Sequence, residues 1–125
     1  MKISSLKDLQ KFTKKISEII IPNDFLFLYG EIGVGKTTFA RQLINIFELK
    51  NNIKKSEVLS PTFNILFEYE IKNFIFKHYD LYRLKNEEDI KNIGLFENEE
   101  KSITIIEWPE LIKNKPTNRI DLFFK

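Results

Sequence analysis

The residues best able to do chemistry lie in one loop. Residues 30–37 read GEIGVGKT, which matches the G-x-x-x-x-G-K-[ST] pattern of phosphate-binding loops, and three of the chain's four glycines fall inside it. Glycine at these places lets backbone N–H groups curl around phosphate oxygens, where a Cβ would block the path. We therefore expect the nucleotide to be bound by the second half of the loop and the start of the next element, namely Gly33, Val34, Gly35, Lys36, Thr37 and Thr38.

Two side chains of this loop have separate tasks in such a site. Lys36 is expected to reach the β- and γ-phosphates, and the hydroxyl of Thr37 to ligate Mg²⁺. The helix expected after the loop directs its positive end at the same anion. The competing interpretation is a glycine-rich turn that binds nothing. The pattern favours binding of a nucleoside triphosphate.

Hydrolysis would need a carboxylate near the metal and a group that orients or deprotonates water. Glu107 is the first candidate for the metal side, because it ends an apolar run, residues 103–106, at the sheet edge where ligands bind. Asp80 is the second candidate acid, at the end of the alternating run 74–79. For each, the alternative is a solvated acid at the end of a strand.

Three further residues near these motifs have open roles. Thr62 could supply a hydroxyl to the γ-phosphate or the metal, as a switch residue does, or could serve only turn chemistry after Pro61. His78, the only histidine, lies two residues before Asp80 on the same strand face, and we favour packing and hydrogen bonding over a role as base. Trp108 fits an interface, the side of a nucleotide or the lid of the core.

The elements that must position these residues alternate between helix and strand. A first helix begins near Ser5, which forms a capping box with Asp8, and its apolar residues Leu6, Leu9, Phe12, Ile16 and Ile19 recur at helical spacing. A second follows the loop over about 36–48 with Phe39, Leu43, Ile46 and Phe47 inside, and a third spans about 87–92, capped by Asn86 and ended by Gly94. Strands are expected over 25–29, 63–70, 74–80, 103–106 and 120–124.

These patterns predict an α/β protein of the P-loop NTPase type, with one domain over residues 1–125. The strand over 25–29 is apolar on both faces, as in the centre of a sheet, and the short connection at 71–73 predicts an antiparallel hairpin. The central sheet is therefore expected to be mixed, with flanking helices.

Composition limits the other classes of function. The 125 residues carry a net charge of +2, which is too mild to argue for nucleic-acid binding. The chain has no cysteine, which excludes disulfides, thiolate catalysis and Cys-based zinc sites. No signal-peptide pattern and no apolar run near the ~20 residues of a membrane span occur, so a cytoplasmic protein without membrane partners is expected.

Four motifs occur together in order and resemble those of the TsaE family, also called YjeE: GEIGVGKTT at 30–38, SPTF at 60–63, HYDLYR at 78–83 and IEW at 106–108. The resemblance covers nearly the whole chain. This family comprises bacterial P-loop ATPases needed to make N6-threonylcarbamoyladenosine at position 37 of tRNAs that read ANN codons. The chain differs in its loop, where the family commonly has DLGAGKTT, and at Lys125, where relatives continue into another strand and tail.

The resemblance implies a cytoplasmic, Mg²⁺-dependent ATPase, weak without its partner proteins, that acts on the TsaB–TsaD heterodimer and meets tRNA only through that complex. By motif position, Asp80 and Glu107 become the acids of the hydrolytic site, with Glu107 near the metal, and Ser60 to Thr62 the switch segment. Tyr82, Arg83 and Trp108 would lie beside the site or face the partner.

Two other enzyme classes use the same loop. A small metabolite kinase is the main alternative, but such kinases usually carry an arginine-bearing lid, and the sequence has no arginine cluster. A GTPase normally shows an N-K-x-D motif, and the nearest string, NKPT at 114–117, lacks the acid. These absences favour ATP hydrolysis.

Overall fold

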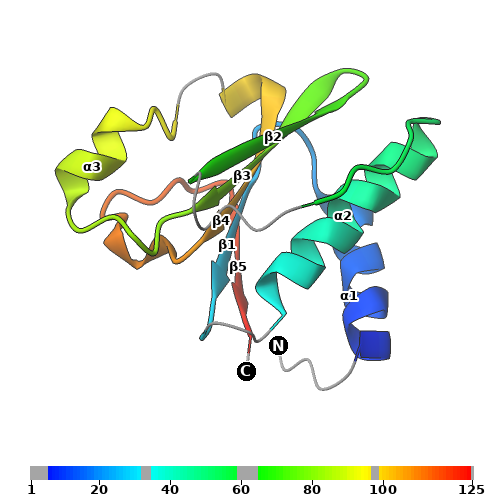
Figure 1. Cartoon of the computed structure of the whole chain (residues 1–125), viewed down its shortest axis with the longest axis horizontal. Helices are drawn as coiled ribbons and strands as arrows, with labels where there is room; N and C mark the ends of the chain where they lie inside the picture. Colours follow the sequence, from blue (N-terminus) through cyan, green and yellow to red (C-terminus); the bar gives the residue numbers. More distant parts are fainter. Residues whose placement is uncertain (1–5, 32–34, 59–64, 97–98, 125) are drawn as a thin grey trace.

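The computed structural model describes residues 6–31, 35–58, 65–96 and 99–124 (Figure 1). Within these ranges five strands form one sheet in the order β2-β3-β4-β1-β5. The strands are β1 (Phe25–Tyr29), β2 (Leu66–Ile71), β3 (Phe74–Asp80), β4 (Ser102–Glu107) and β5 (Arg119–Phe123). The β2–β3 pair is antiparallel, and the other neighbours are parallel. The predicted mixed α/β sheet is confirmed.

Strand β1 lies inside the sheet, between β4 and β5. Its first four side chains are fully buried, as are all six positions of the neighbouring β4. A strand that is covered on both faces favours apolar side chains on both, which explains the run FLFLY. The expectation of a buried interior strand at 25–29 is confirmed, with the predicted bounds.

The helices divide between the two faces of the sheet (Figure 1). Helices α1 (Leu6–Ile19) and α2 (Lys36–Lys50) cover one face, where they pack on Leu26, Leu28 and Ile105. Helix α3 (Glu87–Asn92) and the 3₁₀ turn η2 (Pro109–Leu111) cover the other face, over Phe25 and Phe27. Alternate residues of one strand therefore belong to different cores.

The predicted inner face of α1 is right except at its end. Leu9, Phe12 and Ile16 are buried, but Ile19 is 63% exposed and Ile20 is buried in its place. The helix ends at Ile19, so the chain turns there and the helical spacing no longer decides which residue faces the sheet. Ser5, the predicted cap, lies outside the described residues.

Helix α2 begins at the predicted Lys36 and ends at Lys50, two residues beyond the expected end. Phe39 and Leu43 are buried as predicted, whereas Ile46 and Phe47 are half-buried. Ala40 and Ile44 complete the buried face, because the helix lies on α1 as well as on the sheet.

Strand β3 and helix α3 have the predicted bounds, 74–80 and 87–92, whereas strands β2, β4 and β5 differ from theirs by one to three residues. The hairpin pairs Leu66 with Tyr79 and Ile71 with Phe74, so β2 begins later than the predicted 63, although residues 63–64 are outside the described part. Helix α3 has its expected cap, since the Asn86 side chain accepts a hydrogen bond from the Asp89 N–H at 3.0 Å. Strands β4 and β5 each begin one residue before the expected start. None of the described helices is long and apolar enough to cross a bilayer.

Candidate functional site

Strands β1, β3 and β4 run parallel, so their C-terminal ends meet at one edge of the sheet. The register pairs Asp80 with Glu107 and Leu28 with Glu107, which sets both predicted acids next to the start of the loop that follows β1. Alternation along the strands directs His78, Asp80 and Glu107 to the face that α2 covers. The start of α2 at Lys36 and Thr37 and the acids Asp80 and Glu107 therefore lie together at the C-terminal edge of the sheet, and we call this part of the molecule the corner.

The first turn of α2 needs a residue that tolerates a left-handed backbone. Gly35 precedes the helix with φ 101° and ψ 10°. A Cβ at Gly35 would meet no atom within 4 Å, so the backbone conformation, not the available space, favours glycine here. Thr38 lies in the first turn of the same helix, half-buried.

Lys36 turns back over its own loop. Its ammonium donates a hydrogen bond to the Gly30 carbonyl at 2.6 Å, and the residue is only 4% exposed. The same Nζ lies 3.9 Å from the centroid of the Trp108 ring, a cation–π contact. Burial lowers the pKa of Lys36 from its usual value, while the carboxylates of Glu107 and then Asp80 act in the opposite direction.

Trp108 is held in place by an unusual backbone. It follows β4 with φ 59° and ψ 58°, a left-handed conformation for a bulky residue, and its N–H donates to the Leu28 carbonyl at 3.3 Å. Its ring lies 4.8 Å from that of Tyr82. Trp108 thus lies beside Lys36 and also packs against the core on the α3 side of the sheet, and its role stays a prediction.

The hydroxyl of Thr37 and the carboxylate of Glu107 meet across the corner. Thr37 Oγ1 donates to Glu107 Oε2 at 3.3 Å, although the two residues are 70 positions apart. Glu107 is 4% exposed, and the same Oε2 lies 2.6 Å from Nε2 of the fully buried His78. The favoured packing and hydrogen-bonding role of His78 is thus observed, but its partner, Glu107, could not be named from the sequence.

Asp80 stands beside Glu107 with 5% exposure. Its Oδ1 accepts a hydrogen bond from the Tyr82 N–H at 2.9 Å, which closes the turn after β3. Tyr82 and Arg83 follow this turn and are exposed. Asp80 therefore both shapes the turn and contributes negative charge near Lys36.

The oxygen atoms at this corner suit Mg²⁺. A hydroxyl from Thr37 and a carboxylate from Glu107 lie side by side here, with Thr37 Oγ1 3.3 Å from Glu107 Oε2. Hard oxygen ligands of this kind are the ones that Mg²⁺ prefers in proteins. The described residues contain no cluster of three or more His, Cys, Asp or Glu side chains that could hold a metal.

Four of the predicted site residues, Gly33, Val34, Ser60 and Thr62, lie outside the described residues. The others in the described part gather at the corner: Gly35, Lys36, Thr37, Thr38, Asp80, Tyr82, Arg83, Glu107 and Trp108. The contact between Lys36 and Trp108 and that between His78 and Glu107 are the features that sequence reasoning missed. The only signal for the second was a lone histidine on the strand face of Asp80.

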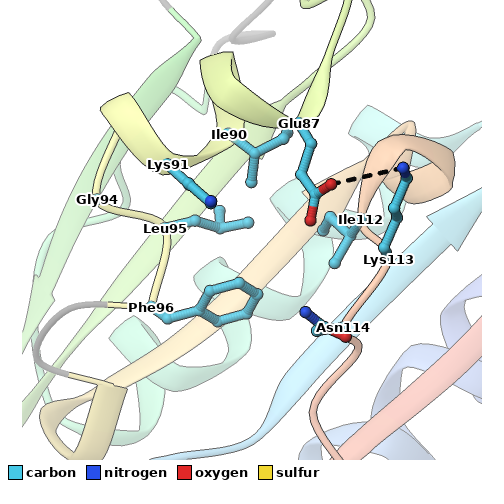
Figure 2. Close-up of a pocket in the computed structure, with 9 residues that line it drawn as sticks. All are labelled: Glu87, Ile90, Lys91, Gly94, Leu95, Phe96, Ile112, Lys113 and Asn114. Carbon is cyan, nitrogen blue, oxygen red and sulfur yellow. Dashed lines mark ion pairs between the residues drawn. The ribbon is translucent and has the colours of Figure 1, made fainter.

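A pocket lies elsewhere, between α3 and the segment that follows η2. Figure 2 shows this pocket of about 430 Å³, with Ile90, Leu95 and Phe96 on one side and Ile112 on the other. An ion pair of 3.5 Å between Lys113 and Glu87 links its two sides. None of the predicted site residues lines it. The corner and this pocket are therefore separate sites on the molecule.

Comparison with known proteins gives one consistent family. A family profile described as threonylcarbamoyl adenosine biosynthesis protein TsaE matches residues 3–125. Proteins named tRNA threonylcarbamoyladenosine biosynthesis protein TsaE include one from Rickettsia bellii, 39% identical over 98% of this chain and 83% of the relative. The one from Rickettsia conorii is 39% identical over 90% of this chain and 62% of the relative. The one from Aquifex aeolicus is 32% identical over 94% of this chain and 80% of the relative.

The fold is also found in a solved structure. The crystal structure of Bacillus subtilus YdiB superposes with a TM-score of 0.70 and 25% sequence identity, over 97% of this chain and 72% of that one. Among the three relatives above, the matched part spans from 62% to 83% of the relative's length.

Proposed function

Because the chain belongs to the TsaE family, we propose that it is an ATP-binding and ATP-hydrolysing subunit required for N6-threonylcarbamoyladenosine formation in tRNA. It acts on the TsaB–TsaD complex, needs Mg²⁺, and meets tRNA only through that complex. The proposal combines two kinds of support: the family, whose members are named for this modification, and a corner of the molecule with the groups that ATP hydrolysis requires.

The observation that carries the hydrolytic part is the contact between Thr37 and Glu107. A loop that only binds phosphate needs no carboxylate, but here Oε2 of Glu107 accepts a hydrogen bond from the Thr37 hydroxyl at 3.3 Å. In hydrolases with this loop, the hydroxyl and an acid at the end of a neighbouring strand hold the metal together. The hydrogen bond between Thr37 and Glu107, 70 residues apart in sequence, supports this role for the pair.

The roles follow from chemistry at each atom. Thr37 and Glu107 would hold Mg²⁺, which when bound supplies positive charge to the phosphates. Lys36 would contact the same phosphates, and Asp80, beside Glu107 in the register, would orient the attacking water. The backbone N–H groups at the start of α2 contribute the positive end of the helix dipole.

Lys36 would change partners when phosphate binds. Its ammonium now donates to the Gly30 carbonyl and is largely out of water. A phosphate oxygen is a stronger acceptor for an ammonium than a neutral carbonyl. Phosphate would therefore draw Nζ away from Gly30 and change its contact with the Trp108 ring.

The exposed side chains near the corner are suited to a partner protein. Tyr82 is 52% exposed although its ring touches Trp108, and Arg83 is exposed next to it. A change at Lys36 would reach this surface through Trp108, because the Trp108 ring contacts both the Lys36 ammonium and, in a tilted arrangement, the Tyr82 ring. We assign Tyr82, Arg83 and Trp108 to the contact with TsaB–TsaD.

The test combines binding and turnover. The chain is incubated with TsaB–TsaD and Mg·ATP, captured with the partner, and phosphate release is followed over time. We expect co-purification and partner-dependent phosphate release, and we expect Glu107→Gln to keep ATP affinity within about threefold while turnover falls at least about 100-fold.

A matched control is Glu110→Gln, an exposed acid three residues further on, which should turn over ATP normally. Phosphate release that is independent of TsaB–TsaD, or full turnover by Glu107→Gln, would contradict the proposal. Transfer of the γ-phosphate to a metabolite would favour the kinase alternative.

A further inference from the structure

The hydrogen bond between His78 and Glu107 links a buried side chain to the corner. His78 is the chain's only histidine, has no exposed surface and lies on β3, next to Glu107 on β4. Its Nε2 is 2.6 Å from Oε2 of Glu107, the oxygen that also accepts the Thr37 hydroxyl. One carboxylate oxygen therefore joins a buried imidazole to the first turn of α2.

The partners of each ring nitrogen indicate where the imidazole proton lies. An ionised carboxylate can only accept, so Nε2 must carry the proton that lies between the two groups. Nδ1 is buried and has no hydrogen-bond partner among the described residues. A proton on Nδ1 would be a buried donor without an acceptor, which is costly. The neutral Nε2–H tautomer leaves only a lone pair without a partner.

The two donors fix the orientation of the carboxylate. Both known hydrogen bonds of the Glu107 side chain go to Oε2, and in the described part of the chain none goes to Oε1. His78 pairs with Ile105 in the register, two residues deeper in the sheet than Glu107. His78 therefore contacts Oε2 from within the sheet, and Thr37 contacts the same oxygen from the first turn of α2. Oε1 is left for other ligands.

We propose that His78 is a positioning residue for Glu107: its Nε2–H holds the carboxylate so that Oε2 stays on Thr37 and Oε1 is presented to the metal and its water. This rests on the proposed ATP hydrolysis. The proposal concerns orientation and not proton transfer, since His78 is fully buried and Glu107 stands between it and Thr37.

Two amide substitutions separate positioning from packing. Glutamine places its side-chain N–H₂ near the position of imidazole Nε2, and asparagine places it near Nδ1, so only His78→Gln can donate to Glu107. We expect His78→Gln to keep kcat within about threefold, and His78→Asn to lose about 10- to 100-fold, as is usual when a ligand loses its supporting hydrogen bond. KM for ATP should change by less than about twofold in both, because Lys36 and the loop hold the phosphates.

Stability is measured alongside, because each amide leaves a smaller side chain in the core. Ile103→Val, a shortened core residue on β4 that touches no site group, is the control for destabilisation alone and should keep its kcat. Equal loss of kcat in the glutamine and asparagine variants, or wild-type kcat in the asparagine variant, would overturn the positioning role.

A spectroscopic measurement tests the same contact without nucleotide. Since the chain has one histidine, the imidazole ¹⁵N signals of the labelled protein belong to His78. We expect one protonated nitrogen, Nε2, and one bare nitrogen, Nδ1, and an upfield shift of the Nε2 proton in Glu107→Gln, whose amide oxygen is a weaker acceptor. A proton on Nδ1, or an Nε2 proton that does not move in Glu107→Gln, would overturn the inference.

Different results would refute the proposed ATP hydrolysis and the proposed role of His78. No phosphate release from the wild-type chain with TsaB–TsaD would refute the hydrolytic function, and with it the role of His78 in turnover. Normal wild-type turnover with an unimpaired asparagine variant would refute the role of His78 alone.

Discussion

Lys36 illustrates how a residue proposed to bind phosphate can oppose the stability of its own fold. Its ammonium is buried against the Gly30 carbonyl and the Trp108 ring, and burial lowers its pKa despite the nearby carboxylates of Glu107 and Asp80. A base whose pKa is lower in the folded state binds protons more weakly there than in the unfolded chain. The charged form of Lys36 therefore destabilises the fold at neutral pH.

Lys36→Met should accordingly stabilise the protein while it removes function. The thioether side chain keeps the packing on Trp108 without the buried charge, so we expect a gain of about 0.5–1 kcal/mol, or about 2–4 °C in Tm, at pH 7. The gain should shrink as the pH rises through the lowered pKa of Lys36 towards 10.5, because the wild-type lysine then loses its proton. Thermal unfolding at a series of pH values measures both effects.

Lys50→Met is the control, an exposed lysine at the end of α2 whose ammonium is 5.6 Å from the Phe47 ring. It should change Tm by little and leave ATP affinity intact, whereas Lys36→Met should weaken ATP binding by more than about tenfold. A destabilised Lys36→Met protein would show that the hydrogen bond to Gly30 outweighs the cost of burying the charge.

At the scale of elements, the residues proposed to bind the nucleotide lie at the C-terminal edge of the sheet, and α3, which only packs on the sheet, lies apart from them. The C-terminal ends of β1, β3 and β4 lead into the loop, Asp80 and Glu107, while α3 packs on the opposite face of the sheet from α2. Loops and strand ends at this edge carry chemistry in parallel sheets, and the elements beneath set their spacing. Changes in α3 should thus affect stability without affecting the site.

Asn86→Ala tests this separation. The Asn86 side chain caps α3 by accepting the Asp89 N–H at 3.0 Å, and loss of such a cap costs about 1 kcal/mol. We expect the free energy of unfolding to fall by about that amount in a denaturant titration, with unchanged ATP affinity. Asn92→Ala, at the other end of the same helix, is the matched control and should stay within about 0.5 kcal/mol of wild type. Weaker ATP binding in Asn86→Ala would mean that α3 and the corner are coupled.

At the scale of the whole molecule, nucleotide binding should raise the stability of every element at once. The corner is built by the loop after β1, the first turn of α2 and the ends of β3 and β4, so the ligand would bind the folded chain only. A ligand at 100 times its dissociation constant then adds about 2.7 kcal/mol. The shift in Tm reports the integrity of the whole site.

We expect Mg·ATP at that concentration to raise Tm by about 10 °C, and chelation of Mg²⁺ to remove most of the shift. The emission of Trp108, the only tryptophan, should change in the same titration because Lys36 leaves its ring. Lys36→Met should show no such change in emission and at most about half of the rise in Tm, because its ATP affinity is at least about tenfold lower. A shift that is equally large with chelator present would contradict metal binding by Thr37 and Glu107.

Local patterns in the sequence determined most of the elements and half of the site. The glycine-rich loop, the apolar run of β1, the hairpin and the Asn86 cap each depend on residues within about one turn or one strand of each other, so their spacing predicts them. The failure at Ile19 has the same cause, since helical spacing predicts which residue faces the core only up to the point where the helix ends.

Only the tertiary structure decided which distant residues meet. The strand order places β4 between β3 and β1, and this order brings Glu107 within reach of both His78 and Thr37 and sets Trp108 against Lys36. Periodicity records which face of a strand a residue occupies, but it holds no information on which strand lies alongside. The start of α2 at Lys36 was therefore predictable from sequence, while the contacts of Lys36 and Thr37 with the aromatic ring and the acid depend on the order in which the strands assemble.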